Sequence, residues 1–504
     1  MIRNQVFKPL RSGGVFKVLT VFLILALALT YSFFVYRYVS NINDYISDEC
    51  WYVSSARNIL SKYFGLTPRF EGDEVLVTVE LTKYLVRESY YSEVRELKSY
   101  VAGIGGAIIK DENYYQFKDD GKYLPAICVK LNRSQIPNIT KLPYVVNVAM
   151  GYCYPTAENI LNYLNFEHPP LVKYLIALAM ATVGDEPGVW RIPSIIAGAL
   201  TLAFVVLTIK KVVGNTSWIY VGMAAAVITA LDPTFRSMSM VAMLDIFVAL
   251  FTILTLYFTL SNSLIGTSVA LGLGIASKLN AAFAGVPAVL VWVNKEKPAK
   301  ALLYLIYIPI ALFLMFNIPF IVKDGFLNWW GSSVEGAIRW HLSVKTTEGP
   351  PQSMPWEWLI GRNPFVLHYV YDPNSGQWVA DIIASGNPVL YLLTVALSIF
   401  ILPSIKDLPD KGLTYIFTWV TYLMYIVMWV AGGKTQYSFY SVQVVPLIYT
   451  LLLELIYYLL SSTANIRKAV ENWVKVFKVI SDWLAGKVKI SVKVVVQDRC
   501  DGMV

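Results

Sequence analysis

The chain has 504 residues, of which 56% are hydrophobic and only 15% are charged, with a mean hydropathy of +0.52 and a formal net charge of +8. Ordinary soluble domains carry about 25% charged residues, so this composition excludes a soluble protein and also a protein with a single membrane anchor. The positive charge does not call for nucleic acid as a partner, because many basic residues lie in short loops and in the C-terminal tail, as the positive-inside rule requires.

The first apolar run, residues 18–36, contains no charged residue and follows four basic ones. A secretory signal is the alternative interpretation, but its apolar core is usually about 7–15 residues long and ends at a small-residue cleavage site. Because this run ends in YRYVSNIND, we expect a retained membrane helix with a cytoplasmic N-terminus.

Two adjacent carboxylates, Asp48 and Glu49, follow this first helix closely, directly after Ser47. One interpretation is structural, because acids in the first turn of a helix interact favourably with its dipole and Ser is a good N-cap. The other is catalytic. We therefore predict that residues 1–65 contain a membrane helix and a second, outer helix that begins at this acidic pair.

Residues 66–158 differ from the rest of the chain. They include the strand-like pieces EVLVTVEL and AICVKL, a charged helical stretch at 82–100, and glycosylation sequons at Asn132 and Asn138. Cys128 and Cys153 would form a disulfide if this segment is external; the spacing leaves that open. We predict a small external α/β insert.

The remainder, residues 159–460, reads as a helical bundle, since a full span needs about 20 apolar residues. Apolar runs lie near 171–184, 192–209, 216–231, 239–260, 264–277, 280–294, 301–321, 387–403, 413–431 and 438–460. The run at 171–184 is short and contains Lys173, which favours a helix lying in the interface. With that choice the basic loops segregate to one side, which predicts about ten spans with both termini cytoplasmic.

The domain limits that follow are a motif-bearing bundle at 159–321, an external loop at 322–386, C-terminal membrane helices at 387–460 and a basic cytoplasmic tail at 461–504. In the tail, apolar residues between 466 and 484 recur on one helical face, typical of a helix lying on a membrane surface. The predicted fold class is an all-α polytopic membrane protein with an external α/β insert.

In this arrangement many polar residues collect on the outer side. Most are explained as charges at helix ends. Asp245 is not explained in this way, because apolar residues flank it in RSMSMVAMLDIFVALF. An ionisable residue in such a position is by default a candidate functional residue.

The stretch 165–201 resembles the protein O-mannosyltransferase family and its membrane relatives of the GT-C class. The resemblance rests on an acidic pair after the first helix, then HPPL at 168–171, then RIPS at 191–194, in that order. The segments RSMSMVAMLDI, GLGIASKLNAAF, SMPWEWLIG, SGNPVLYLL and QYSFYSVQVVPLIY are also similar to those of the family. The resemblance covers most of the chain except 66–158 and the tail.

The resemblance implies a glycosyltransferase in the plasma membrane that uses a polyprenyl-phosphate sugar, typically dolichyl-phosphate mannose. It implies transfer to a hydroxyl on the extracytoplasmic face, with inversion at the anomeric carbon. An alcohol needs a base to take its proton, and the acidic pair supplies it, with Asp48 as our choice and Glu49 beside it.

The leaving phosphate needs cations, and arginine suits phosphate by its planar fork of donors. Our candidates are His168, Lys173, Arg191, Arg236 and Lys278, with Arg191 and His168 favoured. The candidates for positioning substrate are Asp245, His341 and Trp356, the last two from an aromatic-rich loop at 339–358.

Two features depart from the family: the insert at 66–158 enlarges the loop beside the site, and the tail lacks the eleventh apolar span of eukaryotic members. The acceptor thus stays open between Ser or Thr of an exported protein and a lipid-linked or protein-linked glycan. A transporter is a third interpretation, but polar residues deep in mid-span and paired halves are not evident. No metal cluster is visible in the sequence, and a divalent cation between Asp48, Glu49 and the donor phosphate is left open.

Overall fold

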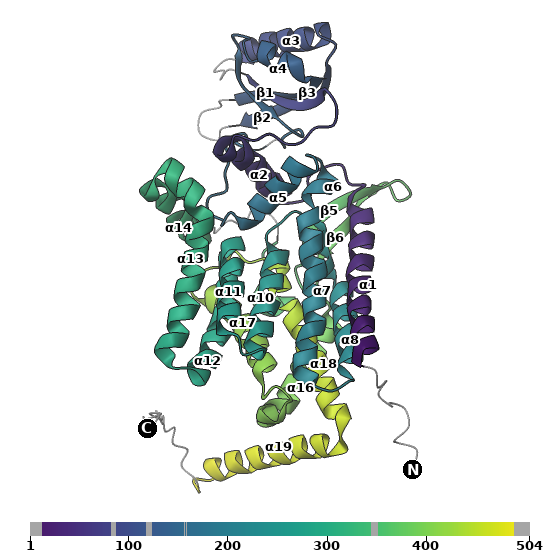
Figure 1. Cartoon of the computed structure of the whole chain (residues 1–504), viewed down its shortest axis with the longest axis vertical. Helices are drawn as coiled ribbons and strands as arrows, with labels where there is room; N and C mark the ends of the chain where they lie inside the picture. Colours follow the sequence, from purple (N-terminus) through teal and green to yellow (C-terminus); the bar gives the residue numbers. More distant parts are fainter. Residues whose placement is uncertain are drawn as a thin grey trace.

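The computed structural model describes residues 13–81, 87–116, 123–155, 157, 159–343 and 351–487. It contains a bundle of helices that runs through the molecule, a small α/β unit at one end and a helix lying across the other end (Figure 1). The helices of the bundle are α1 (Gly13–Val39), α7 (Ile192–Val213), α8 (Trp218–Leu231), α9 (Pro233–Met240), α10 (Asp245–Leu260), α11 (Leu264–Ser277), α12 (Gly285–Lys295), α13 (Pro298–Asp324), α16 (Pro388–Ile401), α17 (Leu413–Val430) and α18 (Val445–Ser461).

Among the described residues, five helical stretches are long and apolar enough to cross a membrane, or seven if two bent helix pairs each count as one span. This confirms a mostly helical protein with several membrane spans. The predicted number of about ten would in addition require the shorter apolar helices α10, α11 and α12 to cross.

The two bends have local causes. Between α8 and α9 the axis turns by 68°, where the Asp232 side chain accepts a hydrogen bond from the Phe235 amide and Pro233 begins the new helix. Proline fits the first helical position but breaks a preceding helix. Between α18 and α19 (Thr463–Leu484) the turn is 104°, so α19 lies across the end of the bundle, as the amphipathic pattern of the tail predicts (Figure 1).

The insert is confirmed as a small α/β unit. Its antiparallel sheet has the order β2 (Ala107–Gln116), β3 (Tyr123–Asn132), β1 (Glu74–Leu81) and β4 (Val145–Met150). The unit also contains α3 (Arg87–Gly103) and α4 (Ile136–Ile139). Alternate residues of β1, among them Val77 and Val79, enter a core shared with α3, as the period of two in a strand dictates.

The opposite face of this sheet packs on the outer helix that begins at the acidic pair, α2 (Glu49–Phe64). Ala126 and Ala149 from the sheet share a small core with Trp51 and Tyr163. A disulfide between Cys128 and Cys153 joins β3 to the segment that follows β4, with the two Cα atoms 5.4 Å apart. The insert therefore packs against α2 and is not connected to the rest of the protein only through its two chain ends.

The predicted external loop at 322–386 contains more structure than we expected. It holds α14 (Phe326–Ser343), α15 (Pro355–Trp358) and a hairpin of β5 (Phe365–Asp372) and β6 (Gln377–Ala384). The hairpin turn ends at Gly376, whose φ of +68° favours glycine. Two shorter helices, α5 (Leu171–Thr182) and α6 (Pro187–Trp190), lie between the insert and α7, and α5 matches the predicted interfacial helix.

Candidate active site

A cavity of about 600 Å³ lies where α2, the chain before α5 and the segment Ser438–Gln443 meet. It brings together Asp48, His168 and Lys278 of the predicted site residues. The other lining residues are Trp51, Tyr52, Asn159, Tyr163, Asn165, Glu167, Phe365, Tyr437, Phe439 and Tyr440.

Asp48 occupies the N-cap position of α2, but its side chain makes no capping hydrogen bond. The carboxylate lines the cavity instead. Burial raises the pKa of Asp48 to about 6; the Lys278 ammonium opposes this increase and the Asp245 carboxylate adds to it. Ser47 is thus not the N-cap, and Asp48, which takes that position, makes no capping bond. The pKa of Asp48 lies near neutral pH, as a general base requires.

Glu49 is turned away from the cavity and is completely buried. Its carboxylate forms a bidentate pair with Arg191, with N–O distances of 2.9 and 2.8 Å, and accepts hydrogen bonds from the Ala242 and Ile46 amides. Asp48 and Glu49 are adjacent in sequence but face different partners, so they do not act here as one pair of carboxylates.

Arg191 is also completely buried, and all five of its N–H donors are used. Two bind Glu49, and the other three bind the backbone carbonyls of Val39, Ile42 and Asp44. No donor of Arg191 is left for a phosphate in this structure. Its contacts hold the turn between α1 and α2.

Lys278 and Asp245 form a second buried ion pair, with the ammonium 2.8 and 3.0 Å from the two carboxylate oxygens. Lys278 ends α11 and Asp245 begins α10. The ammonium lies 4.3 Å from the centre of the Tyr440 ring and reaches the cavity wall, whereas Asp245 lies behind it. Lys278 is thus the ammonium in the cavity wall, and Asp245 holds it.

The predicted phosphate ligand His168 lines the cavity with its ring 5.7 Å from that of Tyr52. Lys173 does not line the cavity. Its ammonium is fully buried and donates to the backbone carbonyls of Leu164, Asn165 and His168. Three carbonyls match the three donors of an ammonium, so Lys173 shapes the loop that carries His168.

The other predicted residues lie elsewhere. Arg236 lines a separate groove. Trp356 is 43% exposed and its ring lies 6.0 Å from that of Trp429. His341 lies near the end of α14, and its side chain is outside the described residues. Neither Trp356 nor Arg236 lines the cavity.

Sequence reasoning did not single out two groups of lining residues. Glu167, directly before His168, bonds to the Tyr163 hydroxyl and to the Asn165 amide. Seven Trp, Tyr and Phe side chains line the cavity: Trp51, Tyr52, Tyr163, Phe365, Tyr437, Phe439 and Tyr440. The signal for Tyr437, Phe439 and Tyr440 is the run YSFY inside the segment QYSFYSVQVVPLIY.

A cluster of three or more potential metal ligands is not found among the residues that the structure describes. The cation site that we left open between Asp48 and Glu49 would need both carboxylates. The Glu49 oxygens are instead held by Arg191 and two amides, so the pair as predicted does not fit a metal ion.

Comparisons with known proteins bear on this site. Residues 167–322 match the family described as dolichyl-phosphate-mannose-protein mannosyltransferase. The chain is 25% identical over 358 residues to a polyprenol-phosphate-mannose–protein mannosyltransferase of Corynebacterium glutamicum, covering 55% of this chain and 68% of that protein. The predicted resemblance is confirmed, and with it the prediction that the chain is a membrane glycosyltransferase.

Among solved structures, the chain is similar to ArnT from Cupriavidus metallidurans bound to undecaprenyl phosphate, with a TM-score of 0.41 and 13% identity over 62% of this chain. The apo state of the same protein gives 0.38 and 14% over 64%. The alignments cover 53% and 56% of the ArnT chains, so the match spans about half of their length.

Proposed function

We propose that this glycosyltransferase moves mannose from a polyprenyl-phosphate carrier to the hydroxyl of Ser or Thr in an exported protein, with inversion at the anomeric carbon. The observation that carries the proposal is a carboxylate without a structural partner, Asp48, in the wall of a cavity that also holds Lys278 and His168. The similarity to the mannosyltransferase of Corynebacterium glutamicum supports the choice of donor and acceptor.

The attacking oxygen of the acceptor forms a bond to the anomeric carbon while the bond from that carbon to the phosphate oxygen breaks. The hydroxyl proton passes to the Asp48 carboxylate, and the polyprenyl phosphate leaves with the electron pair of the broken bond. Because the pKa of Asp48 is about 6, the carboxylate is ionised at neutral pH and still basic enough to accept the proton.

The leaving phosphate gains negative charge, which a fixed cation stabilises more in the transition state than in the ground state. Lys278 is our choice, with His168 as the second group. Two of the three ammonium donors of Lys278 bind Asp245, so the third remains for a phosphate oxygen. Asp245 then acts as a positioning residue, together with Glu49, Arg191 and Lys173.

The aromatic residues suit a sugar, whose apolar ring faces pack on aromatic rings while its hydroxyls bond to polar groups. Phe439 and Tyr440 lie beside Lys278, and the Tyr437 and Phe439 rings are stacked 5.6 Å apart. Glu167 lines the same cavity and offers a carboxylate oxygen to the sugar hydroxyls. We therefore place the mannose in this cavity, against the aromatic rings.

The proposal also contains the orientation in the membrane. The insert, the hairpin and α2, whose residues line the cavity, lie at the end of the bundle away from α19 (Figure 1), and we assign that end to the extracytoplasmic face, with both termini in the cytoplasm. About ten spans result if α10, α11 and α12 cross together with the longer helices.

The test is transfer by purified enzyme from polyprenyl-phosphate mannose to a Ser/Thr peptide, with product mass as the readout. Asp48→Asn removes the base, and Asp44→Asn is the matched control, because Asp44 lies in the same turn with an exposed side chain. We expect transfer to the peptide by wild type and by Asp44→Asn. Transfer only to a lipid-linked or protein-linked glycan would overturn the acceptor and keep the chemistry; wild-type transfer by Asp48→Asn would overturn the chemistry.

A further inference from the structure

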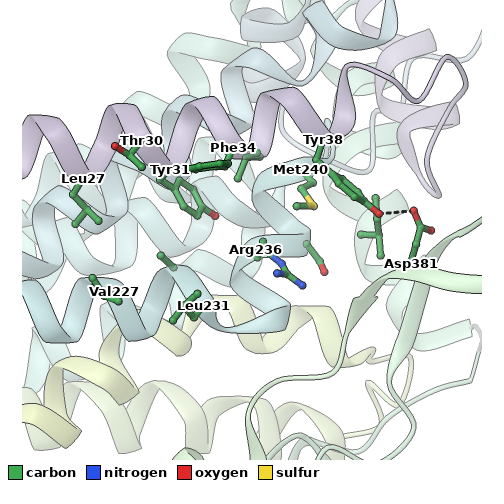
Figure 2. Close-up of a pocket in the computed structure, with 14 residues that line it drawn as sticks. Leu27, Thr30, Tyr31, Phe34, Tyr38, Val227, Leu231, Arg236, Met240 and Asp381 are labelled. Carbon is green, nitrogen blue, oxygen red and sulfur yellow. Dashed lines mark hydrogen bonds between the residues drawn. The ribbon is translucent and has the colours of Figure 1, made fainter.

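A second cavity, of about 460 Å³, opens on the side of the bundle between α1, the α8–α9 pair and β6 (Figure 2). It shares no lining residue with the candidate active site. We call it the lateral groove. Its lining is Leu27, Thr30, Tyr31, Phe34, Val35, Tyr38, Val227, Ala230, Leu231, Arg236, Ser237, Met240, Asp381 and Ile382.

The two ends of the lateral groove differ in character. One end is apolar, with Leu27 of α1 opposite Val227 of α8, and Leu231 lies further along the groove toward Arg236 (Figure 2). The other end is polar, where the Tyr38 hydroxyl donates to Asp381 at 2.8 Å. Eleven residues of α1 separate Leu27 from Tyr38, or roughly 16 Å at 1.5 Å per residue. This length matches one leaflet, since the hydrocarbon core is about 30 Å thick.

Arg236 lies on α9 next to the polar end, and its side chain is exposed. Among the described residues, none forms an ion pair or a hydrogen bond with its guanidinium. The nearby acids already have partners. Asp381 is held by Tyr38 and by His368, whose Nδ1 is 2.7 Å away, and Asp232 accepts from Tyr391 and Tyr449.

An arginine at the lipid-facing side of a bundle is costly unless an anion or water accompanies it. Its planar fork of donors matches the oxygens of a phosphate. The surface therefore offers a cation at headgroup depth beside an apolar channel of one-leaflet length. A lipid has the complementary order, with a phosphate at the surface and a hydrocarbon chain below it.

We infer that the lateral groove binds a glycerophospholipid of the leaflet nearer the active site, with its phosphate on Arg236 and an acyl chain along Leu27, Phe34 and Val227. The sugar donor is a less suitable occupant, because a sugar phosphate bound at Arg236 would lie in a cavity that contains neither Asp48 nor Lys278.

A lipid in this place would connect α1 to α9. The chain that follows α9 carries the Ala242 amide, which donates to Glu49 at 2.7 Å. The bound lipid thus supports, through α9, the buried pair that positions Asp48. Its removal should lower the thermal stability of the enzyme.

The test measures phospholipid retained by the full chain. Protein released from nanodiscs of palmitoyl-oleoyl phosphatidylglycerol is analysed by native mass spectrometry, and the delipidated protein is melted with increasing amounts of the same lipid. We expect wild type to retain one lipid that Arg236→Ala loses, with an affinity at least about tenfold weaker in the variant, as for the loss of a charged hydrogen bond. Arg236→Lys should lie between them.

Arg37→Ala is the matched control, since Arg37 is an exposed arginine near the same end of α1 but does not line the groove; it should behave as wild type. Leu231→Trp places a bulky ring in the groove while keeping Arg236 and should also displace the lipid, so the test survives if Arg236→Ala does not fold. Equal retention by wild type, Arg236→Ala and Leu231→Trp would overturn the inference. Displacement of the phospholipid by polyprenyl phosphate would assign the groove to the donor, and equal stabilisation by inorganic phosphate would show an anion site without lipid.

Discussion

Asp48 and Glu49 are neighbours in the sequence, yet removing their charges should change stability in opposite directions. The Asp48 carboxylate faces the cavity without a structural partner, and burial raises its pKa from 3.8 to about 6. The Glu49 carboxylate holds Arg191 by two short bonds. We therefore expect Asp48→Asn to be more stable than wild type at neutral pH and Glu49→Gln to be less stable.

The magnitude for Asp48 follows from linkage. An acid whose pKa is higher in the folded state holds an extra proton between pH 3.8 and about 6, so its ionisation lowers the stability of the fold as the pH rises through that interval. A shift of about two pH units corresponds to about 3 kcal/mol above pH 6. Because the cavity admits water to the carboxylate, about half of this, or roughly 1.5 kcal/mol, is our expected gain for Asp48→Asn.

For Glu49, loss of one partner of a buried ion pair costs about 3–5 kcal/mol. The assay is thermal unfolding in one detergent at pH 7.5 and at pH 4.5, with transfer measured in parallel at pH 7.5. The gain in Asp48→Asn should fall to about a third at pH 4.5, because that pH lies part-way between the unfolded-state pKa of 3.8 and the folded-state pKa of about 6. Transfer by Asp48→Asn should fall by at least about 10²-fold. A less stable Asp48→Asn at pH 7.5, or a Glu49→Gln as stable as wild type, would refute the reasoning.

Four further outcomes are expected. The initial rate of transfer should rise about tenfold per pH unit below pH 6 and level off above it, because only ionised Asp48 accepts a proton; a rate independent of pH between 5 and 7 contradicts this. Lys278→Met should lower kcat about 10²–10³-fold, and the double variant Lys278→Met with Asp245→Asn should regain melting temperature but not activity; an active double variant would exclude Lys278. Arg191→Lys should melt earlier but keep the KM for donor in the folded fraction, whereas a raised KM with unchanged melting would return Arg191 to phosphate binding. Cysteine labelling from the outer face should modify Glu71→Cys and leave Lys295→Cys untouched, and the reverse pattern would invert the proposed topology.

The sequence was sufficient to predict elements with strong periodicity or length. The first helix, the interfacial helix at 171–182, the α/β insert and the surface helix of the tail all agree with the structure. The sequence was not sufficient to predict the hairpin at 365–384. The alternating aromatic residues of this hairpin lie inside a loop rich in proline and tryptophan. The number of membrane spans could not be predicted either. Helices such as α11, with 14 residues, are so short that composition alone does not decide whether they cross the membrane.

At the candidate site, motif order did not predict which residues face the cavity. Asp48, His168 and Lys278 line it, whereas Arg191, Lys173 and Glu49 lie behind it in buried contacts. The sequence shows that an arginine is present at position 191. It does not show that the N–H donors of this arginine bind three backbone carbonyls and a carboxylate. Asp48 and Glu49 are consecutive at the start of α2, and because consecutive side chains on a helix do not share a face, one lines the cavity and the other is buried.

The bond between Glu49 and Arg191 joins residues that are 142 positions apart, and this separation has a consequence for biosynthesis. A ribosome adds about 5–20 residues per second, so roughly 7–28 s pass between the emergence of the acid and that of its arginine. The insert, which has its own core, is completed within that interval. The nascent chain therefore carries an unpaired carboxylate beside its first membrane helix until α7 arrives, and the turn that aims Asp48 takes its final form only then. A truncated chain that stops before residue 191 would be inserted and folded in part, but it would have no catalytic geometry.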